Sequence, residues 1–232
     1  MPETQETSKP KWIAWAANFW YHHKYPFLLG VLALVTVTVA LITGRGTDKN
    51  AAYLTYAGPY ALSDAEEKQA AEDVAAYLPA DAEKKAVSFS SLYYMTADQI
   101  REKLTEDPSF TVFDRLLAEN LESFDREFEA GDTVIWLVDP WLYERRAVKG
   151  EWITLLEILP KMPEQGIYDQ FAVRLLETDF GKTYFSYLPE DTLICIRRNN
   201  KVASMEGRGA ESEETFEESC ALFRAILSYR AG

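Results

Sequence analysis

Histidine is nearly absent from this 232-residue chain, and the only two, His22 and His23, stand close to the N-terminus. Catalysis by Ser-His-Asp or Cys-His groups and metal sites built on histidine are therefore excluded from everything that follows them. Phosphate-binding loops, dinucleotide glycine motifs, zinc-protease helices and nucleophile elbows are missing as well. Carboxylate pairs remain as possible acid–base groups, but most glutamates stand at expected helix starts or on exposed faces. The sequence predicts no enzyme activity, no cofactor and no metal.

Cysteine is scarce too, since Cys195 and Cys220 are the only two and neither belongs to a C-x-x-C motif or a Cys/His cluster. A structural zinc site is thereby excluded. Two interpretations stay open. The cysteines can form a disulfide that closes a loop of about 25 residues and stabilises the fold by about 3 kcal/mol. Alternatively they are two buried free thiols, because both stand among apolar residues.

Basic residues are outnumbered by acidic ones in most of the chain. Residues 1–44 contain three lysines and two glutamates, a net charge of +1, so the whole-chain charge of -13 leaves -14 for the remainder. A domain this acidic is repelled by phosphate backbones, which argues against nucleic acid as a partner. With 47% hydrophobic and 26% charged residues, the composition is nevertheless that of a folded protein.

One hydrophobic run stands out, FLLGVLALVTVTVALI at residues 27–42, which contains no charge. Nineteen helical residues, 25–43, would span about 28 Å, close to the hydrocarbon thickness of a bilayer. Thr36 and Thr38 can bond to carbonyls of the preceding turn, and aromatic residues precede the run as in a membrane-interface belt. The sequence predicts a single transmembrane helix at residues 25–43 and the lipid bilayer as a partner.

The orientation of this helix depends on few charges. Three lysines precede it, whereas Arg45 and Lys49 follow it, so the positive-inside rule favours a cytoplasmic N-terminus by one lysine. A cleavable signal peptide is the competing interpretation, but the end of the run lacks a clean A-x-A site. We expect a single-pass cell-membrane protein with a juxtamembrane aromatic and basic segment at 1–24, the helix at 25–43, a linker at 44–50 and an extracytoplasmic domain at 51–232.

Beyond residue 50 the pattern alternates between strands and helices. Capping boxes begin at Ser63 and Thr96, Gly131 ends the clearest amphipathic helix, and the continuous apolar run TVIWLV suits a central strand. The expected fold class is α/β, a single domain with a mixed, partly parallel sheet. Strands are expected at 52–57, 86–93, 133–138, 171–176, 192–197 and 201–205, and helices at 63–78, 96–104, 111–130, 151–159 and 213–229.

Several short motifs follow in a familiar order: Phe128-Glu129-Ala130-Gly131-Asp132 with TVIWLVD, then Gly150-Glu151-Trp152-Ile153-Thr154-Leu155, then Ala172-Val173-Arg174-Leu175 before Leu188-Pro189-Glu190-Asp191. With the N-terminal helix, this order resembles membrane-anchored short relatives of the extracellular solute-binding (periplasmic binding-like) proteins. The resemblance implies a solute-binding-like lobe and a role in ligand binding or sensing.

Candidate ligand-binding residues follow two expected strands. In α/β sheets, ligands sit beyond the carboxyl ends of strands, where this chain has Tyr56 and Tyr60 after the first strand and Asp139, Trp141 and Tyr143 after the central one. A carboxylate with aromatic rings can bind a cation or a ring face. Alternatively, Trp141 and Tyr143 are packing residues and Asp139 caps a turn at Pro140.

Two functions remain open from the sequence. The first is an acidic extracytoplasmic module that binds or senses a small molecule. The second is a non-catalytic structural or adaptor subunit that docks another membrane protein. A pocket lined by Tyr60, Trp141 and Tyr143 would favour the first, and a flat apolar patch would favour the second.

Overall fold

In the computed structural model, the residues described are 50–80, 82, 86–198 and 209–231, together with 15, 19–21, 24–25, 28–36 and 38 near the N-terminus. The chain divides into two units, Met1–Asp48 and Lys49–Gly232, which are treated separately. The predicted linker at 44–50 lies outside the described residues except for its last one, and the strand predicted at 201–205 lies wholly outside them.

Residues 28–36 and 38 of the first unit are helical. As predicted, Thr36 Oγ1 donates to the Leu32 carbonyl at 2.9 Å and Thr38 Oγ1 to the Leu34 carbonyl at 2.7 Å. The Trp15 and Phe19 rings stack with centroids 5.6 Å apart, which places them on one helical face. Large apolar side chains are exposed along the helix, namely Leu28, Leu29, Val31, Leu32, Leu34 and Val35.

Within the described residues, no helix combines the length and the apolar character needed to cross a membrane. Of the helix predicted at 25–43, residues 26–27, 37 and 39–43 lie outside the described part of the chain.

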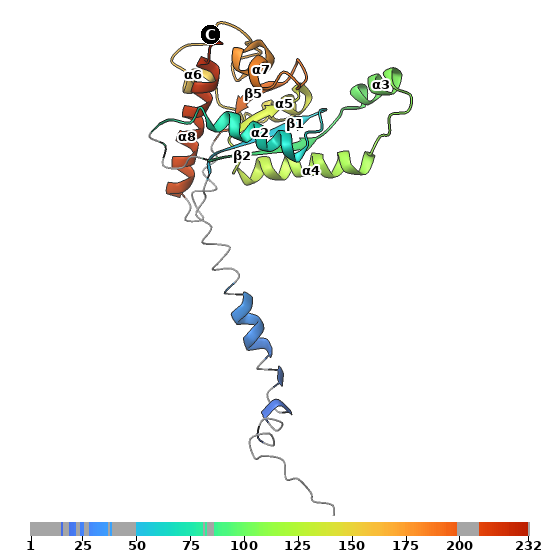
Figure 1. Cartoon of the computed structure of the whole chain (residues 1–232), viewed down its shortest axis with the longest axis vertical. Coiled ribbons are helices and arrows are strands. Elements are labelled where there is room, and N and C mark those ends of the chain that lie inside the picture. The colour runs from blue at the N-terminus through green and yellow to red at the C-terminus, as the bar shows by residue number, and fades with distance from the viewer. Residues whose placement is uncertain are drawn as a thin grey trace, which may run out of the picture. The chain divides into compact units, whose positions relative to one another are not determined.

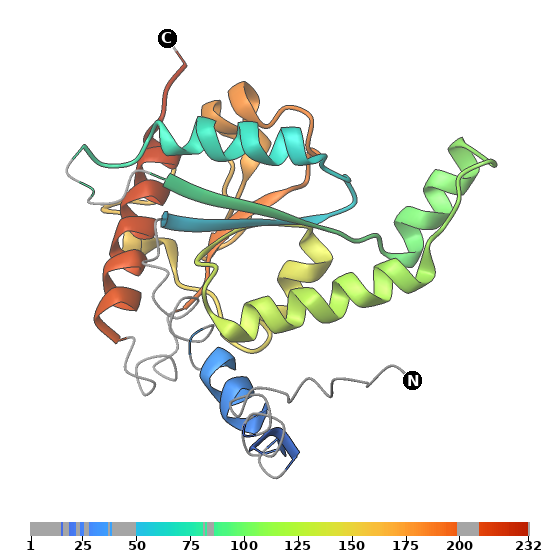
Figure 2. The ribbon, with the colours of Figure 1, turned by 60° about the horizontal axis from the view of Figure 1, so that its bottom comes forward.

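The second unit is built on one five-stranded sheet with the strand order β2-β1-β3-β5-β4. β1 pairs in parallel with both β2 and β3, whereas β5 pairs antiparallel with β3 and β4. The predicted mixed, partly parallel sheet is confirmed (Figures 1 and 2). The strands are β1 (Asn50–Gly58), β2 (Ala86–Tyr93), β3 (Ile135–Val138), β4 (Ala172–Arg174) and β5 (Leu193–Ile196).

The third strand occupies the middle of the sheet, as its uninterrupted apolar run predicted. All four residues of β3 are buried, because helices cover both of its faces. Side chains alternate between the two faces: Ile135 and Leu137 enter one core, and Trp136 and Val138 enter the other.

Helices cover the two faces of the sheet unequally. The Ile135 face is packed by α2 (Asp64–Ala75), α6 (Leu155–Ile158), α7 (Asp179–Tyr184) and α8 (Gly209–Ser228). The Trp136 face is packed by α4 (Asp114–Ala130) and α5 (Pro140–Ala147). Figure 2 shows α2 and α4 on opposite sides of the strands, so the unit has three layers.

One helix contributes nothing to either core. α3 (Ala97–Glu106) begins with the predicted capping box at Thr96 and has no buried residue. Together with the first turns of α4 it extends away from the body (Figures 1 and 2). Phe113 and Leu116 at the start of α4 are exposed.

The helices differ from the sequence expectations at four places. The helix expected at 151–159 is only the four-residue α6, because Trp152 instead forms a bridge with Arg197. Two helices were missed: α5, which Asp139 caps with Pro140 in the first turn, and α7, which Thr178 caps. The helix expected from residue 111 begins at Asp114.

The two cysteines are free and buried, so the possible disulfide between Cys195 and Cys220 is wrong. They belong to different cores, because Cys195 of β5 faces α4 and α5 whereas Cys220 of α8 packs on the other side of the sheet. Burial raises the pKa of both thiols, that of Cys220 to about 11. The second interpretation, two buried free thiols, is confirmed.

Candidate functional site

A hollow of about 460 Å³ opens where strands β2 and β3 end. Asp139, Pro140 and Trp141 follow β3, and Tyr94 follows β2. Its remaining lining comes from Thr96, Ala97, Asp98 and Gln99 at the start of α3 and from Asp191 before β5. The hollow therefore lies at the carboxyl ends of parallel strands, as expected for a ligand site in an α/β sheet.

Backbone hydrogen bonds hold the edge of this hollow. The Asp139 N–H donates to the Ala57 carbonyl at 2.8 Å, and the Tyr94 N–H donates to the Gly58 carbonyl at 2.8 Å. Both bonds extend the pairing of β1 with its neighbours by one residue. The two chain segments that enter the hollow are thus fixed to the same central strand.

Asp139 is the most deeply buried ionisable group of the hollow, with 4% of its surface exposed. Its Oδ1 accepts from the Trp141 N–H at 2.8 Å, which caps α5, and its Oδ2 accepts from Gln99 Nε2 at 2.7 Å. Burial raises the pKa of Asp139; the Gln99 and Trp141 hydrogen bonds oppose this, and the charge of Asp191 adds to it. The carboxylate is held in position but incompletely compensated.

Gln99 orients that carboxylate. Its Oε1 accepts from the Thr96 N–H at 2.8 Å, which leaves Nε2 as the donor that faces Asp139. The sequence identified Gln99 as a helix cap and missed its role in the hollow. The two roles share one side chain, so the start of α3 is tied to the start of α5.

A flat aromatic surface forms another part of the wall. Trp141 is 44% exposed and stacks on Tyr94, with ring centroids 5.4 Å apart and planes 20° from parallel. The Arg145 guanidinium lies 5.8 Å from the Trp141 ring. Among the described residues, no basic side chain lines the hollow, whereas Asp98, Asp139 and Asp191 do. The wall thus combines carboxylates with π faces, the groups that bind organic cations.

Two tyrosines predicted after the first strand do not line the hollow. Tyr56 is buried in the core, and its hydroxyl accepts from the Tyr60 N–H at 3.1 Å. Burial is the main reason that the pKa of Tyr56 is raised. Tyr60 donates to Glu66 Oε1 at 2.8 Å and packs on Tyr187.

Tyr143 also lies outside the hollow. It is fully buried, stacks on Trp152 at 5.4 Å, and donates to Asp169 Oδ2 at 2.6 Å. The expected pocket of Tyr60, Trp141 and Tyr143 is therefore wrong. A residue's place after a strand does not say to which side of the sheet it turns, and Tyr143 turns into the core.

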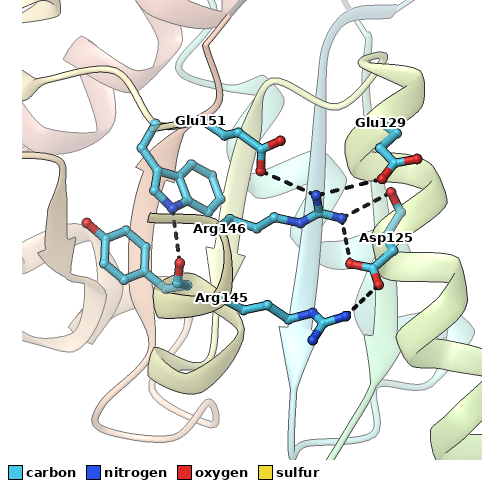
Figure 3. A network of polar contacts seen from close by, with 7 residues as sticks. Asp125, Glu129, Arg145, Arg146 and Glu151 are labelled. Atoms are coloured by element: carbon cyan, nitrogen blue, oxygen red, sulfur yellow. Dashed lines mark hydrogen bonds and ion pairs between the residues drawn. The ribbon is translucent and has the colours of Figure 1, made fainter. Parts of the chain in front are cut away.

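A network of ion pairs around the buried Arg146 fixes α5, the helix that Asp139 caps (Figure 3). Arg146, 1% exposed, donates to Asp125 Oδ1 at 2.5 Å and to Glu151 Oε2 at 3.3 Å, and Arg145 pairs with Asp125 Oδ2 at 2.9 Å. The Arg146 guanidinium also lies 4.6 Å from the Phe128 ring. These contacts join α5 to α4. They thereby help to position Asp139 and Trp141, which lie at the start of α5.

In the described part of the chain, no group of three histidine, cysteine, aspartate or glutamate side chains is arranged to hold a metal ion. Neither family models nor curated proteins nor solved structures provide a match to this chain.

Proposed function

We propose that the protein is a non-catalytic ligand-binding module whose hollow takes a small organic cation. One observation carries this proposal: the buried Asp139 carboxylate, oriented by Gln99, lies beside the exposed Trp141–Tyr94 stack in a hollow of about 460 Å³. An ammonium group near Asp139 would offset the repulsion from Asp191, and an apolar or aromatic body would cover Trp141.

The size and charge of the hollow agree with this ligand class. Small-molecule sites commonly enclose about 300–1,000 Å³ and combine aromatic walls with a few placed polar groups. The strong negative charge of the chain after residue 44 would also draw cations toward the module.

We place this module outside the cell membrane, anchored by the helix at 25–43 with its N-terminus in the cytoplasm. The charge-free run at 27–42, the exposed apolar side chains along residues 28–35 and the lysines before the run support this placement. The resemblance to solute-binding proteins agrees with a solute-binding-like lobe on such an anchor.

A second candidate function is docking of another membrane protein. The observation that favours it is α3, which buries no residue, and the neighbouring exposed Phe113 and Leu116 at the start of α4. Exposed apolar residues on a projecting element are typical of a protein contact.

The ligand proposal is tested with three probes of matched shape: phenethylamine, 2-phenylethanol and phenylacetate. Full-length protein in phosphatidylcholine nanodiscs is titrated with each probe by calorimetry. The binding that Trp141→Ala weakens belongs to this hollow, and in that part the amine should bind most tightly and the carboxylate least. Asp139→Asn should weaken amine binding about tenfold, because a charged hydrogen bond is lost.

Glu119→Gln is the matched control, since Glu119 is an exposed carboxylate on α4 that does not line the hollow. Equal amine affinity in Asp139→Asn and in this control would overturn the proposal, and so would phenylacetate binding that Trp141→Ala weakens more than it weakens amine binding. Trp141→Ala is a second variant, which leaves every carboxylate in place. It should weaken amine binding, because the ring that covers the ligand is lost. For the anchor, protease added to intact cells should digest the domain, and digestion only after lysis would overturn the orientation.

A further inference from the structure

A second hollow, of about 300 Å³, lies between the end of α8 and the segment that follows α6. Its apolar wall is formed by Leu159, Met162, Pro163 and Leu227, and its rim carries Arg224 and Arg230. It shares no residue with the hollow at Asp139.

The wall of this hollow is formed by residues that pack against the core. α6 ends at Ile158, and Leu159 is extended, with φ -100° and ψ 143°, before Pro160. Leu159, Met162 and Leu227 are partly buried and pack against the core on the α8 side of the sheet. Arg224 and Leu227 stand three residues apart on α8 and so face the same side. Arg224 Nη1 donates to the Ile158 carbonyl at 3.5 Å, which joins the two walls.

The charge of this hollow is opposite to that of the first. Lys161 and Glu164 pair with each other at 2.9 Å, so their charges cancel. Among the described residues, Arg224 and Arg230 form no ion pair within 4 Å. The carboxylates Glu177 and Asp179 line a neighbouring smaller hollow that Arg230 also borders, but Arg224 does not. Arg224 is thus the arginine that lines the apolar hollow and not its acidic neighbour.

We propose that this second hollow binds a small apolar carboxylate. The apolar body would lie on Leu159, Met162 and Leu227, and the carboxylate would accept hydrogen bonds from the Arg224 and Arg230 guanidinium groups. Guanidinium groups match carboxylates geometrically and remain charged at any physiological pH. In a chain of net charge -13, two arginines beside an apolar wall form a local site for an anion that the rest of the surface repels.

The test uses 4-fluorophenylacetate as the probe, followed by the fluorine NMR linewidth on adding full-length protein in phosphatidylcholine nanodiscs. Ser228 lines this hollow and is exposed, so a substitution there should not disturb folding. Ser228→Glu places a negative charge in the hollow and should abolish binding, whereas Ser228→Gln, of the same size and neutral, should leave most of it. Arg224→Gln should weaken binding about tenfold.

Two controls separate this site from general attraction to the protein. Arg101→Gln removes an exposed arginine of α3 and should leave the carboxylate affinity unchanged, as should Asp139→Asn. Equal binding by Ser228→Glu and Ser228→Gln would overturn the proposal. So would the absence of any carboxylate binding by the wild-type protein, or carboxylate binding that Arg224→Gln does not change.

Discussion

The two faces of the sheet bury different kinds of side chain. On the α8 face, the buried side chains of the described residues include no charged group: they are apolar apart from small hydroxyls such as Ser219 of α8, and a cluster of aromatic rings around Phe180 closes this core. On the α4 face, two buried arginines, Arg146 and Arg197, lie on the same phenylalanine, Phe128, at 4.6 and 5.3 Å. One face therefore depends mainly on apolar packing, and the other also contains guanidinium groups that have lost their water.

Removing these arginines from water is energetically unfavourable. Arg197 is 5% exposed, and burial lowers its pKa. Its Nη1 donates to the Gly131 carbonyl at 3.4 Å, and a side chain at Gly131, where φ is +85°, would collide with the guanidinium. Asp139 caps α5, which packs on this face, so the position of the hollow depends on the side of the sheet that contains buried charge.

The largest effect is expected from a packing residue of the apolar face. Phe223→Ala removes a fully buried ring and should lower the free energy of unfolding by about 3–5 kcal/mol, because a cavity remains. Urea unfolding of the full chain measures it. Phe113→Ala is the control, because Phe113 is 61% exposed and its loss should cost well under 1 kcal/mol. Similar losses in the two variants would contradict the assignment of this core.

Arg146→Ala tests the charged face. Breaking a buried pair costs about 3–5 kcal/mol, but water reaches Asp125 and Glu151, so we expect about 2 kcal/mol here. Arg145→Ala removes the exposed partner of the same Asp125 and should cost less than about 1 kcal/mol. If both variants lose equally little, the network does not hold α5 in place.

Much of the fold was predictable because its signals are local. The strands carry a local pattern, either the alternation seen in Ala86–Tyr93 or the apolar run of Ile135–Val138, and capping boxes announced α2 and α3. α5 was missed because its eight residues carry charges and Asp139-Pro140 also suits a turn. The burial of Arg146 was not predictable, since its carboxylate partners are distant in sequence or beyond the helix end.

The site was half predictable for the same reason. Asp139 and Trp141 were found because they follow the central strand directly. Tyr94, Gln99 and Asp191 were missed because only the sheet order brings their segments to one edge.

A smaller effect is expected where the hollow meets α3. Gln99→Ala removes both the helix cap and the hydrogen bond to Asp139, and should lower the free energy of unfolding by about 1 kcal/mol. Gln69→Ala removes an exposed glutamine of α2 that donates to Asp73 one turn along the helix, and should change stability by less than about 0.5 kcal/mol. Chemical unfolding compares them, and an equal response would show that Gln99 does no more than an ordinary surface side chain.

The smallest expected effect is a difference in pH dependence. Burial would raise the pKa of Asp125, but Arg145 and Arg146 together outweigh burial and hold it below the ordinary 3.8. The pairing therefore stabilises the fold above pH 3.8 and is lost as the pH falls through the lowered pKa. Between about pH 5 and about pH 2, wild type should lose more stability than Asp125→Asn. Parallel curves from urea midpoints would contradict this.

The two buried thiols allow the opening of the two sides of the sheet to be compared in time. Cys195 lies in the charged core and Cys220 in the apolar one, and both are shielded from solvent with raised pKa values. An alkylating reagent reaches each only when its own side of the sheet opens. The order in which the two are modified would show which side of the sheet opens first, without any substitution in the chain.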